Sequence, residues 1–372
     1  MIDPRIFYDM IQSKGSDFYV GVPDSLLANF CSFLDTKGKE HHLIAANEGN
    51  AIAIAMGYYM STNKVAAVYM QNSGLGNSIN PLVSLTDPLV YKIPMLLIIG
   101  WRGEPGYKDE PQHQKQGGIT IKQLEILDIP YWILDEKTDV ENIIDEVFLK
   151  IENRGAPVAI IVRKNTFKKT IEQSYPKNHS QILREEAIDV ILNLTNENDL
   201  IIATTGKTSR EIFEIRKKAN IEQRDFLTVG GMGHASSIAL GLSIGMPDRR
   251  VICFDGDGSI IMHMGSMPVI SKYKPKKFIH ILLNNGTHES VGGQPTCADI
   301  ISFRNFAHSV GYLKYVLVDN LENLESAWSL INKNLQGPVM LEIKIKNGSR
   351  DDLGRPTNTA EENKNLFMKN II

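Results

Sequence analysis

Short runs of apolar residues alternate along the whole chain with longer stretches of helical periodicity, and glycine, asparagine or proline bounds most of the runs. Continuous apolar runs of this length are typical of strands that are buried on both faces of a parallel sheet. The pattern predicts strands at 18–20, 65–70, 95–100 and 157–162, and again at 200–203, 226–229, 250–254, 278–283 and 338–345. We therefore expect an α/β protein with two doubly wound, mainly parallel sheets.

A polar, lysine-rich stretch with Tyr175-Pro176 near its centre separates the two halves. Such composition is typical of an exposed connector. We expect a first domain at 1–165, a linker at 166–184 and a second domain at 185–372.

The composition is that of an ordinary soluble enzyme, with 42% hydrophobic and 22% charged residues. The 40 basic and 43 acidic residues give a net charge of −3, which argues against a nucleic-acid or membrane partner. Cys31, Cys253 and Cys297 show no metal-binding spacing, and no secretory signal pattern opens the chain. We expect a cytoplasmic protein.

Polar residues follow two neighbouring strands of the second half, at 255–259 and at 284–285. The 25 residues between Gly258 and Asn284 suffice for one covering helix and a return strand, so both strand ends lie at one edge of the sheet. There Asp257 and Asn285 offer oxygen ligands to a hard octahedral cation such as Mg²⁺, and Ser259 opens a helix toward an anion. The ordinary alternative for Gly-Asp-Gly is a tight turn.

The spaced Gly-Asp-Gly and Asn-Asn pair resembles the cofactor signature of thiamine diphosphate enzymes. This resemblance implies that Asp257, Asn285 and the backbone carbonyl of Thr287 bind Mg²⁺, while Mn²⁺ would suit the same ligands. It implies that Gly256, Gly258, Ser259 and Asn285 also contact the cofactor.

The same resemblance requires a glutamic acid that hydrogen-bonds the cofactor's aminopyrimidine. Glu48 begins a stretch of small and apolar residues at 48–57, where an acid can stay protonated and donate. An acidic residue favoured by the helix dipole is the alternative. Asn72 follows a strand end and is expected to border the pyrimidine or the substrate.

Two further segments are expected to shape the cofactor site. One begins with Gly206, Lys207 and Thr208, which open a helix after a strand and suit the distal phosphate. The segment lacks the upstream glycine of a nucleotide P-loop, which argues against a nucleoside triphosphatase. Gly231 and Gly233 allow close approach of the backbone. By resemblance Met232 is an apolar wedge beneath the cofactor, although a methionine that fills core space is common.

The order of the two halves, with no room for a third domain, resembles the thiamine diphosphate-dependent decarboxylases of 3-phosphonopyruvate and 3-sulfopyruvate. The resemblance covers nearly the whole chain and is strongest at 21–27, 47–49, 71–76, 109–113, 284–296 and 348–357. It implies decarboxylation of 3-phosphonopyruvate to phosphonoacetaldehyde and carbon dioxide, a step in phosphonate biosynthesis, with sulfopyruvate as the alternative substrate.

Such a 2-oxo acid with a 3-phosphonate is strongly anionic and needs fixed cations. The loop at 101–118 offers Arg102, Lys108 and His113 after a strand end, and Ser25 is a further candidate. His113 could pass a proton to the product, since imidazole titrates near neutral pH. A solvated loop of mixed charge is the alternative for Lys108.

The segment after the last strand carries Arg350 and Arg355. It is expected to act as a flap that brings Arg355 over the phosphonate, or else as a basic tail that contacts its own domain. His288 and Glu289 line the pocket or support the metal ligands.

The resemblance also implies a homodimer or a tetramer, with the cofactor held at the subunit interface. A catalytically silent cofactor-binding subunit is a rival interpretation, and the presence of Glu48 with Asp257 and Asn285 argues against it. A dinucleotide dehydrogenase is disfavoured because no Gly-x-Gly-x-x-Gly follows the first strand.

Overall fold

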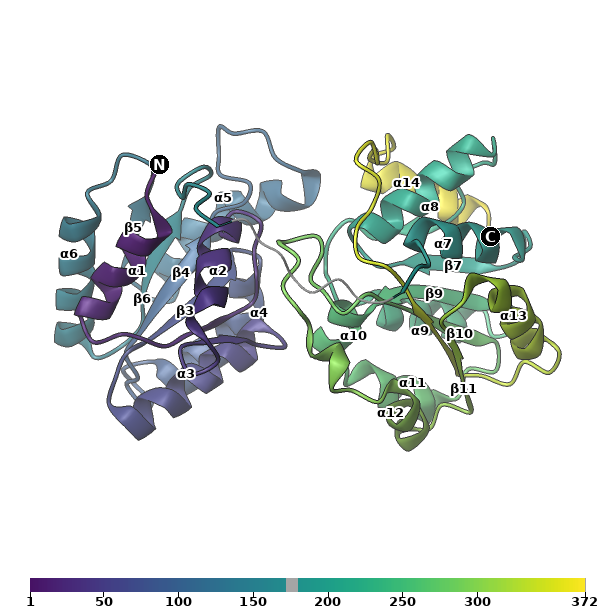
Figure 1. Cartoon of the computed structure of the whole chain (residues 1–372), viewed down its shortest axis with the longest axis horizontal. Helices are drawn as coiled ribbons and strands as arrows, with labels where there is room; N and C mark the ends of the chain where they lie inside the picture. The colour runs from purple at the N-terminus through teal and green to yellow at the C-terminus, as the bar shows by residue number, and fades with distance from the viewer. Residues whose placement is uncertain (172–179, 372) are drawn as a thin grey trace. The chain divides into compact units, whose positions relative to one another are not determined.

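The computed structural model of the chain describes residues 1–171 and 180–371. The chain divides into two compact units, Met1–Tyr175 with Val291–Gln294 and Pro176–Ser290 with Pro295–Ile372. Each unit is an α/β layer structure with its own sheet and its own core (Figure 1).

The first unit is built on a six-stranded parallel sheet with the order β2-β1-β3-β4-β6-β5. Its strands are β1 (Tyr19–Gly21), β2 (His42–Ile44), β3 (Ala66–Gln71), β4 (Met95–Gly100), β5 (Tyr131–Leu134) and β6 (Val158–Val162). Its helices are α1 (Pro4–Ser13), α2 (Ala28–Leu34), α3 (Glu48–Thr62), α4 (Gly74–Pro81), α5 (Pro111–Ile126) and α6 (Val140–Arg154).

Helices cover both faces of this sheet. Side chains alternate along β3, so that Ala67 and Tyr69 belong to the core under α1, α2 and α6, whereas Val68 and Met70 belong to the core under α3, α4 and α5 (Figure 1). All the residues of β4 are buried, as expected for a central strand of a doubly wound sheet.

The second unit repeats this plan with a six-stranded parallel sheet in the order β11-β12-β10-β9-β7-β8. Its strands are β7 (Leu200–Ala203), β8 (Phe226–Leu227), β9 (Val251–Gly256), β10 (Phe278–Asn284), β11 (Lys314–Val318) and β12 (Val339–Lys344). Its helices are α7 (Arg184–Asn193), α8 (Lys207–Lys218), α9 (Ala235–Gly245), α10 (Asp257–Met262), α11 (Ser266–Tyr273), α12 (Phe303–Val310), α13 (Leu324–Asn332) and α14 (Ala360–Lys369).

One face of the second sheet packs against α7, α8 and α13, and the other face packs against α9 to α12 (Figure 1). Helix α14 lies beside β8, where the rings of Phe226 and Phe367 are 5.6 Å apart. Within the described part of the chain, no helix has the length and the apolar character that crossing a bilayer requires.

The predicted fold class is confirmed, and both sheets are parallel throughout the described residues. Strands β2, β5 and β11 were not predicted, because each lies at a sheet edge and has few buried residues. The expectation of one covering helix between β9 and β10 was wrong, since two short helices, α10 and α11, fill that crossover. The predicted linker at 166–184 includes residues 172–179, which lie outside the described residues, and its limits stay a prediction.

Candidate active site

Asp257 and Asn285 meet at the carboxyl edge of the second sheet. Leu283 pairs with Gly256 in the register of β10 and β9, so the two residues follow neighbouring strand ends. The carboxylate of Asp257 is buried and accepts hydrogen bonds from the backbone of Asn285 and, at 2.5 Å, from the hydroxyl of Thr296. The predicted convergence is confirmed, and the role of the pair in metal binding stays a prediction.

The first asparagine of the Asn-Asn pair has a structural task. The amide nitrogen of Asn284 donates to Glu342 at 2.8 Å, and its oxygen accepts from the backbone of Gly286 at 3.2 Å. Asn284 therefore shapes the turn at the end of β10, while the backbone of Asn285 donates to Asp257.

The groups around this turn fit a hard divalent cation. Burial raises the pKa of Asp257 to about 6, and a bound cation would offset the cost of keeping this carboxylate charged. The hydroxyl oxygen of Thr287 is buried and has no hydrogen-bond partner among the described residues. A carboxylate, an amide oxygen and a peptide carbonyl are the ligand types that Mg²⁺ prefers.

Helix α10 begins at Asp257, so the expectation that Ser259 opens the helix was wrong by two residues. Ser259 instead lies inside the first turn, where its hydroxyl accepts from the backbone of Gly233 and contacts the Thr204 hydroxyl, both at 3.1 Å. These contacts join the 231–233 turn to α10 and to Thr204, which directly follows β7.

Residues 231–233 bring Met232 next to the Asp257 turn. Gly231 and Gly233 adopt positive φ values of 67° and 85°, which favour glycine. A Cβ on Gly258 would lie 3.5 Å from the methyl carbon of Met232 and 3.1 Å from a ring nitrogen of His288. Burial lowers the pKa of His288 to about 4, so its imidazole is neutral at physiological pH.

The predicted start of α8 is confirmed, with Gly206 as the N-cap at φ 96° and Lys207 as the first helical residue. Thr208 is buried in the first turn. The ammonium group of Lys207 lies 2.6 Å from a carboxylate oxygen of Glu289. Lys207, which we expected to bind the distal phosphate, is therefore already paired with an acidic side chain.

Glu289 belongs to a buried cluster of charges. Its carboxylate also accepts from Arg184 at 2.8 Å, and Arg184 binds Glu211 through two nitrogens at 2.7 and 2.9 Å. Burial alone would raise the pKa of Glu289, but Arg184 and Lys207 lower it overall. Sequence patterns gave no sign of this cluster, because its members are dispersed over α7, α8 and the loop after β10.

In the first unit, Glu48 is the first residue of α3, as predicted. The preceding Asn47 caps the helix by accepting from the backbone of Asn50 at 2.9 Å. Glu48 is buried, and its carboxyl group accepts from the side chain of Asn77 at 2.9 Å. A Cβ on Gly74 would lie 2.5 Å from the Cγ of Glu48, so α4 approaches this closely only with glycine there.

Asn72 is fully buried between loops. Its amide nitrogen donates to the backbone carbonyl of Arg102 at 2.8 Å and to the Thr120 hydroxyl at 2.9 Å, and its oxygen accepts from the backbone of Arg102 at 3.2 Å. These bonds occupy the side chain, so Asn72 fixes the start of the Arg102 loop. Its predicted contact with the pyrimidine or the substrate stays a prediction.

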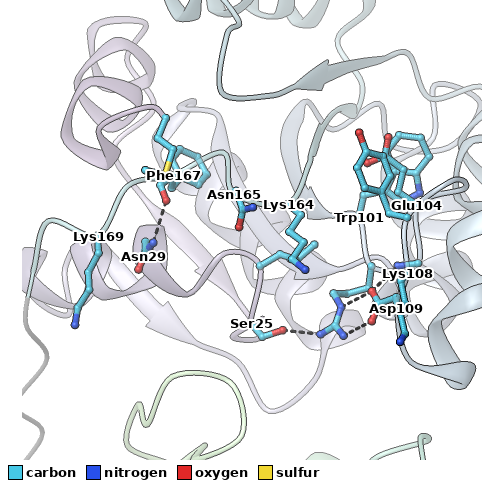
Figure 2. Close-up of a pocket in the computed structure, with 15 residues that line it drawn as sticks. Ser25, Asn29, Trp101, Glu104, Lys108, Asp109, Lys164, Asn165, Phe167 and Lys169 are labelled. Carbon is cyan, nitrogen blue, oxygen red and sulfur yellow. Dashed lines mark hydrogen bonds and ion pairs between the residues drawn. The ribbon is translucent and has the colours of Figure 1, made fainter.

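A cavity of about 510 Å³ opens in the first unit (Figure 2). Two predicted substrate residues meet in it, because the Arg102 guanidinium donates to the Ser25 hydroxyl at 2.7 Å. The same guanidinium donates to the carboxylate of Asp109 at 2.8 Å. Lys108 lines the same cavity. The lining also includes polar and charged residues that the sequence did not single out: Asn29, Glu104, Lys164, Asn165 and Lys169.

His113 lies in the first turn of α5, half-buried, and does not line this cavity. Burial and, next, the charge of Arg102 lower its pKa below the usual 6.5. A Cβ on Gly103 would lie 1.9 Å from the carbonyl oxygen of His113, and Gly103 has φ 68°, so this close approach requires glycine. The predicted proton transfer by His113 stays untested.

The segment after β12 contacts its own unit. Arg350 forms ion pairs with Glu185 at 3.0 Å, with Glu214 and with Asp352, and the backbone of Gly354 donates to Glu214 at 2.9 Å. This arrangement agrees with the alternative of a basic tail for Arg350. Arg355 is exposed and outside the cavity lining, and its contact with a phosphonate stays a prediction.

Comparison with known proteins places both units in one group of enzymes. Residues 4–126 match the family model for the N-terminal TPP binding domain of thiamine pyrophosphate enzymes, and residues 205–343 match the model for the C-terminal TPP binding domain.

Relatives match over nearly the whole chain. A phosphonopyruvate decarboxylase of Streptomyces viridochromogenes is 31% identical over 360 residues, which cover 92% of this chain and 88% of the relative. A phosphonopyruvate decarboxylase of Streptomyces hygroscopicus is 30% identical, with 90% and 86% covered. A sulfopyruvate decarboxylase of Methanosarcina acetivorans is 26% identical, with 96% and 94% covered.

Proposed function

Because the chain belongs to the thiamine pyrophosphate enzymes and, among them, to the phosphonopyruvate decarboxylase family, we propose that it decarboxylates 3-phosphonopyruvate to 2-phosphonoacetaldehyde and carbon dioxide. The observation that carries the choice of substrate is the cationic cavity of the first unit. A substrate with a carboxylate and a phosphonate needs such a cavity, whereas plain pyruvate does not.

The lysines supply the charge that this cavity can offer to a ligand. Arg102 is paired with Asp109, and Glu104 is paired with Arg163 at 2.8 Å. Lys108, Lys164 and Lys169 are exposed cations on the same lining. We assign the phosphonate to these lysines, with Ser25 and Arg102 as hydrogen-bond donors of fixed position.

The cofactor is thiamine diphosphate with Mg²⁺. Asp257, Asn285 and the carbonyl of Thr287 would hold the metal, and the starts of α8 and α10 would receive the diphosphate through their free backbone amides. When bound, thiamine diphosphate supplies a nucleophilic carbon and an electron sink for the electrons released with carbon dioxide.

Glu48 acts on the cofactor as a hydrogen-bonding acid in this proposal. Its burial keeps water from the carboxyl group, and the bond from Asn77 fixes one oxygen, which leaves the other for the aminopyrimidine. His113 lies in the segment after the Arg102 loop and is our candidate for passing a proton to the product. Its lowered pKa makes the neutral imidazole the main form at pH 7, so the ring has to take up a proton before it can pass one to the product.

Decarboxylation of 3-sulfopyruvate is the second candidate, supported by the match to the Methanosarcina relative. A sulfonate carries one negative charge and a phosphonate up to two, so a cavity with several lysines favours the phosphonate. The test is to incubate the purified protein with each substrate, with and without thiamine diphosphate and Mg²⁺, and to measure the aldehyde. Faster cofactor-dependent turnover of sulfopyruvate would reverse the assignment.

We also propose a cytosolic homodimer in which residues of both subunits hold each cofactor. The family resemblance supports this proposal. Sedimentation of the active protein tests it, and a fully active monomer would contradict it.

A further inference from the structure

The side chain of Asn285 has two chemically different ends, and only one of them suits a metal ion. The amide oxygen accepts hydrogen bonds and can bind a cation, whereas the NH₂ group can only donate. The orientation of this amide therefore decides whether the turn after β10 can bind a metal.

Two neighbours of Asn285 select the same orientation. The NH₂ group donates to Oε2 of Glu289 at 2.9 Å, and a carboxylate can only accept. From the other side, the backbone N–H of Thr287 donates to the Asn285 oxygen at 3.0 Å, and an N–H can only donate. Reversing the amide would place two donors against each other at one end and two acceptors at the other, which costs both bonds.

Glu289 is itself held by cations on two helices. Lys207 at the start of α8 contacts Oε1 at 2.6 Å, and Arg184 at the start of α7 contacts Oε2 at 2.8 Å. Arg184 is buried and fixed by its two bonds to Glu211. The carboxylate is only 12% exposed, so its position follows from packing and charge rather than from solvent.

We propose that Glu289 is the positioning residue that turns the Asn285 oxygen toward the metal. The proposal rests on the proposed function, which places Mg²⁺ at Asp257 and Asn285. Lys207 thereby serves the metal site through Glu289, in addition to any contact with phosphate.

The test compares Glu289→Ala, Glu289→Gln and the control Glu325→Gln, an exposed acid on α13 of the same unit. Electron paramagnetic resonance of Mn²⁺, titrated into the protein with thiamine diphosphate, reports both the metal affinity and the symmetry of its ligands. Thermal unfolding without metal, measured in parallel, reports any purely structural loss.

We expect Glu289→Ala to weaken Mn²⁺ binding about 10- to 100-fold and to change the spectrum of the bound ion. Glu289→Gln should lose clearly less affinity than Glu289→Ala, because its oxygen can still accept from Asn285 and Arg184, although its NH₂ group cannot accept from Lys207 and that contact is lost. Glu325→Gln should change nothing.

Unchanged Mn²⁺ affinity in Glu289→Ala would overturn the proposal, and so would an equal loss in both Glu289 variants, since that would indicate charge rather than orientation. If the wild-type protein binds no Mn²⁺ with thiamine diphosphate, the result contradicts the proposed function and, with it, the role of Glu289.

Discussion

The hydroxyl of Thr296 donates a hydrogen bond of 2.5 Å to Oδ2 of Asp257, although the two residues are 39 positions apart. The oxygen of Thr296 in turn accepts from the backbone of Ala298 at 3.2 Å, which fixes the direction of the hydroxyl. Oδ2 is thus held by the Thr296 hydroxyl, and the carboxylate also accepts from the backbone of Asn285. The bond from Thr296 also lowers the pKa of Asp257 against the larger effect of burial.

Thr296→Val should weaken Mg²⁺ binding about tenfold, because it removes a partner that supports the ionised carboxylate. Calorimetry of Mg²⁺ binding with thiamine diphosphate measures the change. Thr195→Val is the matched control, since the Thr195 hydroxyl only bonds the backbone of Leu192. If the wild type, Thr296→Val and Thr195→Val bind Mg²⁺ with equal affinity, Thr296 does not support the metal ligand Asp257.

Glu48→Gln should lower kcat about 10²- to 10⁴-fold, the usual range for the loss of a positioned acid. The variant keeps a side-chain oxygen for Asn77 and so retains the packing of α3 against α4. Mg²⁺ affinity should change little. Turnover close to that of the wild type would remove Glu48 from the mechanism.

Lys164→Ala and Lys169→Ala should each raise the KM for phosphonopyruvate about tenfold, which corresponds to about 1.4 kcal/mol of lost binding. The physical reason is the loss of a cation from the cavity lining. Steady-state kinetics at constant ionic strength measures KM and kcat separately. Lys150→Ala, on the exposed side of α6, is the control. The same KM in the cavity variants and the control would contradict the assignment of the phosphonate to these lysines.

Asp109→Asn should lower the free energy of unfolding at pH 7 by about 1–3 kcal/mol, because Arg102 loses a charged partner. The bonds from Arg102 hold the pKa of Asp109 at about 2 in the folded protein, below its value of about 3.9 in an unfolded chain. The stabilisation is therefore complete above pH 5 and decreases as the pH falls from about 4 toward 2.

Denaturant unfolding at a series of pH values checks this prediction. Asp145→Asn is the control, because Asp145 forms an exposed ion pair with Lys14 and should contribute less than about 1 kcal/mol. A difference between wild type and Asp109→Asn that stays constant down to the acid transition would contradict it.

The sequence predicted the central strands and the chemistry at their ends, because both leave local patterns. A buried parallel strand is a continuous apolar run, and Asp257 and Asn285 directly follow such runs. The edge strands β2, β5 and β11 leave no such pattern, since solvent allows polar residues on them. The Asp257 and Asn285 turns follow the central strands β9 and β10, whereas Glu48 begins the helix after the edge strand β2 and was identified from the small and apolar residues that follow it.

Partners that are far apart in the chain could not be predicted. Thr296 reaches Asp257 and Glu289 joins Arg184 with Lys207 only after the loops have packed. Lys164 and Lys169 belong to no motif and enter the cavity because they follow β6. Asn72 lies at a strand end, as predicted, and its side chain forms two hydrogen bonds with the backbone of Arg102 that hold the Arg102 loop in place.

Calorimetric titration of thiamine diphosphate into the purified protein, with Mg²⁺ and with the metal removed by chelation, tests the central claim most directly. We predict saturable binding of one cofactor per chain that requires Mg²⁺ and that Asp257→Asn abolishes. Binding that does not need the metal, or that survives in Asp257→Asn, would contradict the assignment of the site.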